Sequence, residues 1–164
     1  MEVNKESRGP LVTLSRSHAG LVRRMFELEI PEITEGVVII KNVAREAGSR
    51  TKISVYSRDE SVDAVGACIG NRGMRIDSIL DELDGEKIDI IRYSEIPEDY
   101  VAEALSPATV ISAEMDGERF CRVVVPSDQL SLAIGKEGQN VRLAARLTGL
   151  KIDINAEGYE KRAD

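Results

Sequence analysis

The chain contains 164 residues, enough for one ordinary domain or for two small ones of roughly 60–80 residues each. Its formal charge is −7, from 29 acidic and 22 basic side chains, which argues against indiscriminate binding to polyanions. A local nucleic-acid site is compatible with this charge, because the field near a groove matters more than the sum. The longest uncharged apolar stretches fall far short of the roughly 20 residues of a membrane span, so no membrane contact is expected.

The chain opens without a charged-then-apolar signal sequence, and Cys68 and Cys121 are isolated in apolar surroundings. We expect buried, reduced thiols in a cytoplasmic protein. The only histidine, His18, comes near a helix start and is accompanied by no Ser-His-Asp set, metal-ligand cluster or phosphate-binding P-loop. The sequence therefore predicts no enzymatic activity, no metal and no cofactor.

Residues 1–14 contain at most one short strand, which cannot fold alone and is expected to be the end of a preceding domain or a linker. Ser17 then offers an N-cap for a helix that Pro31 is expected to end. The apolar stripe of this helix consists of Leu21, Val22, Met25 and Leu28.

A strand over 37–40 and an alternating strand over 52–56 follow, with a turn at 47–49 between them. The alternation predicts that the second strand buries one face. A pair of helices and a closing strand over 87–91 complete the first unit.

A short linker, residues 94–97, leads to a helix that begins at Pro97. Asp116-Gly117 is a two-residue hairpin signal between two strands. The second unit then repeats the helix pair and the closing strand. Its strands are predicted over 110–115, 120–125 and 152–154, and a polar tail follows.

One short pattern occurs twice in the chain, once in each unit. Gly70-Asn71-Arg72-Gly73 and Gly135-Lys136-Glu137-Gly138 each separate two apolar helical patterns. The stripe after the first is Ile76, Ile79, Leu80 and Leu83; adding 65 to each number gives Val141, Ala144, Ala145 and Thr148. Both copies close on Lys-Ile-Asp-Ile. The repeat predicts two tandem units.

Two glycines three residues apart can end one helix and start another within four residues, and they allow another backbone to come close. The start of the second helix presents unsatisfied N–H groups with a partial positive charge, which suits a phosphate. An aspartate at Gly70 and Gly135 is therefore expected to abolish nucleic-acid binding and to leave the fold largely intact.

Side chains in and after these loops are expected to face solvent and to contact a phosphate backbone. Arg72 and Lys136 are the strongest candidates, whereas Glu137 should repel a phosphate unless it complements the helix start. Arg45, Arg50 and Lys52 are weaker candidates for a positive rim. The expected site comprises Gly70, Asn71, Arg72, Gly73, Arg75, Gly135, Lys136, Glu137, Gly138, Asn140, Arg142 and Arg146.

The order helix-strand-strand-helix-Gly-x-x-Gly-helix-strand resembles the type II KH domain, which clamps about four nucleotides of single-stranded nucleic acid. Strings in both units resemble the NusA family of bacterial transcription factors. These include residues 26–33 (FELEIPEI), 50–53 (RTKI), 85–91 (GEKIDII) and 128–144 (DQLSLAIGKEGQNVRLA). In that family a polymerase-binding domain and an OB-fold domain precede the KH pair, and Arg8-Gly9-Pro10 resembles the end of that OB fold. Tyr93 and Leu150 stand where the family often has tryptophan.

The resemblance implies an α+β fold of two tandem type II KH domains, each a three-stranded sheet covered by helices. We expect the end of an OB fold or a linker at 1–14, KH domains at 15–94 and 95–155, and a polar tail at 156–164. The implied function is single-stranded RNA binding for transcription elongation, termination and antitermination. The implied partners are nascent RNA and, through the full-length protein, the RNA polymerase elongation complex, with other transcription factors as candidates; we expect a monomer.

A second hypothesis is a scaffold whose KH folds only present surfaces to other proteins. The negative charge, Glu137 and the scarcity of aromatic residues favour it, whereas the repeated loops and the family resemblance favour RNA binding. In either case the linker is too short for a flexible tether. We therefore expect a fixed orientation of the two units, with both loops along one RNA path.

Overall fold

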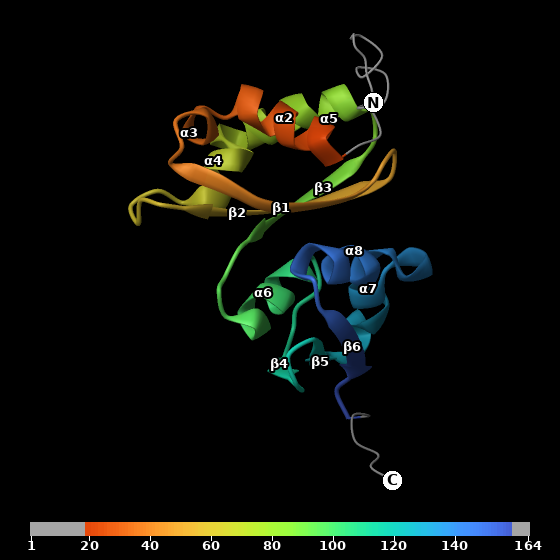
Figure 1. The fold of residues 1–164 in the computed structure, drawn as a ribbon. Coiled ribbons are helices and arrows are strands. Elements are labelled where there is room, and N and C mark those ends of the chain that lie inside the picture. The colour runs from red at the N-terminus through yellow and green to blue at the C-terminus, as the bar shows by residue number, and fades with distance from the viewer. Residues whose placement is uncertain (1–18, 159–164) are drawn as a thin grey trace, which may run out of the picture.

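The protein is described by a computed structural model that defines residues 19–158, and its elements follow the predicted order twice (Figure 1). The expected strand within residues 1–14, the N-cap at Ser17 and most of the expected tail lie outside the described residues. The first unit comprises α2 (Ala19–Glu29), α3 (Pro31–Thr34), β1 (Val38–Glu46), β2 (Arg50–Ser57), α4 (Ala64–Ile69), the 3-10 turn η1 (Asn71–Gly73), α5 (Met74–Leu83) and β3 (Lys87–Arg92).

The second unit repeats this order after a short linker. It comprises α6 (Pro97–Ala104), β4 (Ser112–Met115), β5 (Phe120–Val125), η2 (Ser127–Gln129), α7 (Leu130–Ile134), η3 (Lys136–Gly138), α8 (Gln139–Thr148) and β6 (Lys151–Ala156). In each unit the middle strand is antiparallel to the first strand and parallel to the third. The expected α+β fold with two three-stranded sheets is confirmed.

Several local predictions differ from the structure. The first helix ends at Glu29, just before Pro31 as predicted, but Pro31 also begins the short helix α3, because proline suits a first helical turn. The Asp116-Gly117 signal lies in a longer turn, since the last strand pair is Met115 with Cys121. The last strand extends to Ala156, which is buried and does not belong to a solvated tail.

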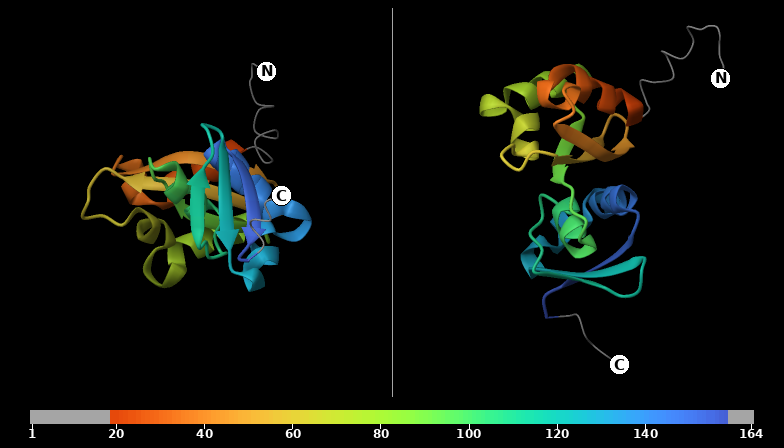
Figure 2. Two further views of the ribbon diagram at one scale, coloured as in Figure 1. Left: turned by 90° about the horizontal axis from the view of Figure 1, so that it is seen from below. Right: turned by 60° about the vertical axis from the view of Figure 1, so that its left-hand side comes forward.

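The prediction that β2 buries only one face is also wrong, because both of its faces are buried. Ile53 and Val55 pack into the first domain's core, whereas Lys52 and Ser54 face the second domain and are equally inaccessible. Figure 1 shows the reason: α2, α4 and α5 lie on one side of the first sheet, and α6 and α8 lie on the other. The second sheet forms the outermost layer and is seen face-on from below in Figure 2.

Specific polar contacts join the domains across this interface. The Tyr100 hydroxyl lies 2.8 Å from the Ser54 Oγ, and the Asn42 Nδ2 donates to the Leu147 carbonyl at 3.1 Å. Ala44 of β1 packs within the hydrophobic cluster of the second domain. The expected packing of the two units is confirmed, and these buried contacts hold the domains together in addition to the short linker.

Both cysteines are free and buried, as expected. Burial raises the pKa of the Cys68 thiol to about 12 and also raises that of Cys121. Between residues 19 and 158, none of the helices has the length and apolar character needed to cross a membrane.

Because thiolate is the reactive species, both thiols should label slowly in the native protein. With a disulfide-exchange reagent at about pH 8, we expect labelling at least about a hundredfold slower than in urea. Fast stoichiometric labelling of native protein would contradict this prediction.

Candidate nucleic-acid interface

The two Gly-x-x-Gly loops, residues 70–73 and 135–138, have nearly the same backbone conformation. Gly70 has φ 82° and ψ 175°, and Gly135 has φ 84° and ψ 168°. The third residues, Arg72 and Glu137, are both left-handed, with φ of 55° and 56°. The sequence repeat is therefore a repeat of geometry, and each loop leads directly into the first turn of α5 or α8.

The first glycine of each loop is required by close approach of the next helix. A Cβ on Gly70 would lie 2.9 Å from the Arg75 backbone nitrogen, and one on Gly135 would lie 2.6 Å from the Asn140 backbone nitrogen. A side chain at either position also opposes the positive φ. The expectation that aspartate at Gly70 and Gly135 leaves the fold intact is therefore wrong, because the helix backbone would have to move.

The residues between the glycines lie at the tips of the loops. Asn71, Arg72, Lys136 and Glu137 are all exposed, as the sequence predicts. Non-glycine residues rarely adopt a left-handed conformation, and it costs roughly 1–2 kcal/mol. Such strain is characteristic of ligand clamps, so the tips remain the strongest candidates for phosphate contact.

Arg75 does not face solvent freely, contrary to the expectation. Its Nη1 donates to the Ala67 carbonyl at 2.8 Å and to the Glu32 carboxylate at 2.7 Å. The side chain thus ties the start of α5 to α4 and α3. Arg75 positions the first loop, and its charge is already paired.

Asn140, the equivalent residue in the second domain, is 1% exposed and was also expected in solvent. Its Nδ2 donates to the Ala133 carbonyl at 2.9 Å and to the Leu105 carbonyl at 3.0 Å, while Oδ1 has no partner among the described residues. These bonds join α8 to α7 and to the end of α6. A base or phosphate cannot reach this side chain without opening the loop.

A carboxylate from the first domain occupies the flank of α8. Glu46, at the end of β1, accepts from Arg142 Nε at 2.6 Å, from Arg142 Nη2 at 3.0 Å and from Gln139 Nε2 at 3.0 Å. Arg146 lies 3.8 Å away and is 54% exposed. Hydrogen bonds from Arg142 and Gln139 lower the pKa of Glu46 to about 2. Arg142 is thus paired, whereas Arg146 keeps most of its exposure.

The expected positive rim on the first hairpin is absent. The Arg45 guanidinium binds the buried Glu86 carboxylate, and Arg50 and Lys52 both bind Asp89. These cations neutralise buried or partly buried acids and do not extend the loop surface. Sequence reasoning missed Glu46 and Gln139, and no local signal marks them, because their contact joins residues 93 positions apart.

The Glu46 contact predicts a pH-dependent contribution to stability. Because the pKa of Glu46 is lowered in the folded state, its ionised carboxylate stabilises the fold at pH values above the ordinary pKa of 4.5. This contribution is lost as the pH falls towards about 2. At about pH 7, Glu46→Gln should lower the free energy of unfolding by about 1 kcal/mol, and the difference should vanish near pH 2.

Urea unfolding of both proteins across this pH range measures the effect. The control is Glu118→Gln, on the exposed β4–β5 turn, which should show no such dependence. A Glu46→Gln difference that persists unchanged at low pH would refute the assignment.

Comparison with known proteins agrees with the geometry. Residues 16–93 match the NusA-like first KH domain, and residues 97–162 match the NusA-like second KH domain. The crystal structure of APE1850 has a similar fold, with a TM-score of 0.56 and 24% identity over 81% of this chain and 96% of that one.

Full-length relatives carry the name transcription termination/antitermination protein NusA. The Halalkalibacterium halodurans protein is 56% identical over 95% of this chain and 41% of its own length. The Mycobacterium tuberculosis protein is 57% identical over 94% of this chain and 45% of its own length. The Thermus thermophilus protein is 49% identical over 97% of this chain and 41% of its own length. The chain thus spans about two fifths of the length of these relatives. With both KH domain types matched in order, the chain belongs to the NusA family.

Proposed function

We propose that this chain is a single-stranded RNA-binding region of a transcription elongation, termination and antitermination factor. The repeated Gly-x-x-Gly geometry supports the RNA-binding part, and the names of the relatives support the role in transcription. The RNA polymerase elongation complex is a partner of the longer protein under this proposal, in the cytoplasm. The chain itself acts as a monomer without catalysis.

RNA contact is assigned to the loop tips and the helix starts behind them. The backbone N–H groups of the first turns of α5 and α8 meet phosphates, and Arg72 and Lys136 supply the charge. Arg146 is a secondary contact, because it retains most of its exposure beside Glu46. Arg75, Asn140 and Arg142 are positioning residues.

Charge reversal at the tips tests this assignment without disturbing a glycine. Arg72→Asp with Lys136→Asp should weaken binding of a labelled single-stranded RNA of about ten nucleotides by at least about tenfold. The slope of log affinity against log salt should fall by about 0.7 for each phosphate that the variant no longer neutralises. Aspartate tolerates the left-handed conformation at position 72 better than most residues.

Arg119→Asp with Lys151→Asp is the matched control, since both residues are exposed and the net charge changes equally. The control should lose less than about threefold in affinity. Native circular dichroism with unchanged affinity in the tip variant, or an equal loss in the control, would refute the assignment.

The proposal also places both loops on one RNA strand of about eight or more nucleotides. Insertion of about ten Gly/Ser residues after Ser94 should by itself change affinity little, because the buried interface still joins the domains. Adding Ala44→Glu, which places a charge in that interface, should lower affinity for the long RNA by about tenfold or more.

Binding of a tetranucleotide should be unchanged in the combined variant, because each domain keeps its own loop. The affinity of Ala44→Glu without the insertion for the long RNA should lie between the affinities of the parent and the combined variant. Equal affinity of parent and combined variant for the long RNA would show that the domains act independently.

A further inference from the structure

The helix pair α2 and α5 covers one face of the first sheet, and its outer surface is uncovered within the described chain (Figure 1). The equivalent pair in the second domain, α6 and α8, packs its outer surface against the first sheet. One interface in this molecule therefore already uses this helix surface. Its counterpart in the first domain is covered by no element among residues 19–158.

The helices α5 and α8 carry opposite charges at corresponding positions, while on α2 Arg24 is paired with Glu27. The helices α5 and α8 have equal length and follow equivalent loops, so positions 65 apart correspond. Arg142 and Arg146, which meet Glu46 across the domain interface, correspond to Asp77 and Asp81. Leu143 and Leu147 correspond to Ser78 and Glu82. The basic surface of α8 contacts an acidic group, so the acidic surface of α5 is suited to a basic one.

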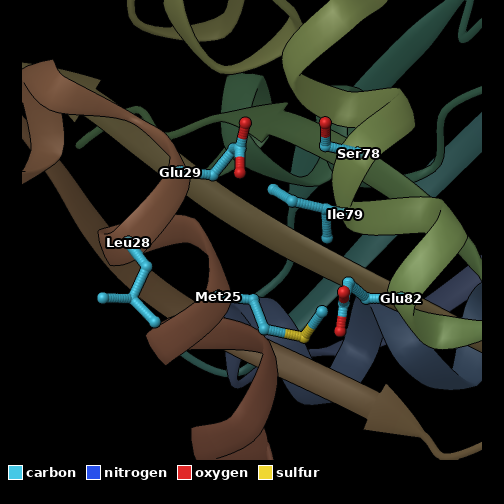
Figure 3. A pocket seen from close by; sticks show the side chains of 6 residues that line it. All are labelled: Met25, Leu28, Glu29, Ser78, Ile79 and Glu82. Carbon is cyan, nitrogen blue, oxygen red and sulfur yellow. The ribbon is translucent and has the colours of Figure 1, made fainter.

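A hollow of about 270 Å³ lies between α2 and α5. In Figure 3, Met25 and Glu29 extend from α2 towards α5, and Ile79 and Glu82 extend from α5 towards α2. Leu28 also lines the hollow and is 73% exposed. Glu29, Glu82 and the nearby Asp81 make no ion pair with any residue in 19–158.

We propose that the α2–α5 surface docks an amphipathic, basic segment of a partner protein. An apolar side chain of the partner enters the hollow beside Met25 and Leu28, and its basic side chains meet Asp81 and Glu82. This is the helix-in-groove mode of recognition. RNA is repelled by these carboxylates, so the surface is separate in chemistry from the loop tips.

The test uses a helical peptide of about 16 residues with leucine on one face and lysine on the other, and a matched peptide with glutamate in place of lysine. On the isotope-labelled chain, the lysine peptide should shift amide resonances of α2 and α5, and the glutamate peptide should shift none. Asp81→Lys with Glu82→Lys should weaken the lysine peptide by at least about tenfold. Lysine near a helix C-terminus favours the helix, so this variant keeps its fold.

Glu114→Lys with Glu118→Lys, both on exposed positions of the second domain, makes the same change in net charge. It should weaken the peptide less than about twofold. Leu28→Ser should weaken the peptide, whereas Ile111→Ser, at another exposed apolar residue, should not. Affinity for the single-stranded RNA should be retained in Asp81→Lys with Glu82→Lys.

Equal loss in the Glu114 and Glu118 control, or resonance shifts elsewhere in the chain, would overturn the proposal as bulk attraction. Concentration-dependent dimers that disappear in Leu28→Ser would overturn it in favour of a second copy. Higher peptide affinity after removal of residues 1–18 would overturn it in favour of this chain's own segment.

Discussion

A buried lysine between the two domains is the contact on which the arrangement of the molecule depends. Lys52 is fully inaccessible, and its ammonium donates to the Asp89 carboxylate at 2.9 Å and to the Ser106 carbonyl at 2.7 Å. Burial lowers its pKa, and a buried charge without partners costs several kcal/mol. One of its two acceptors belongs to the second domain. In the docked arrangement, the second domain therefore supplies one of the two acceptors of this buried ammonium, and the same docking sets where the two loops lie.

Docking also decides which cations are available to a ligand. Docking places the first hairpin, and with it Glu46, beside α8. Glu46 forms an ion pair with Arg142 and lies close to Arg146. Arg75 is taken up by Glu32 within its own domain. The exposed tips then carry few charges, so the proposed RNA binding would draw on the N–H groups at two helix starts as much as on side chains. A chain with a net charge of −7 can in this way keep a local site for a polyanion.

The parts of the structure that the sequence predicts are those set by local chemistry. Helix and strand order, the turn before Arg50 and the paired loops follow from periodicity and from glycine. The roles of Arg142 and Lys52 depend on partners 96 and 54 residues away, so no local pattern announces them. The strand 52–56 illustrates the limit: alternation correctly separates two faces, but only the tertiary structure shows that a second domain covers the polar one. The exposure of the two middle residues in each loop was predictable, because the middle of a short connection between two helices lies on the surface.

The two domains show which features of the loop are fixed and which depend on surroundings. The second residue of the helix after each loop is Arg75 in one copy and Asn140 in the other. Both side chains donate an N–H to a carbonyl of the helix before the loop. The bond persists because the close approach at the first glycine requires the two helices to be held together, whichever donor is used. Glu137 takes the same left-handed conformation as Arg72 despite its opposite charge. Backbone contact thus sets the shape of each loop, whereas the residues that it presents vary with what each copy faces.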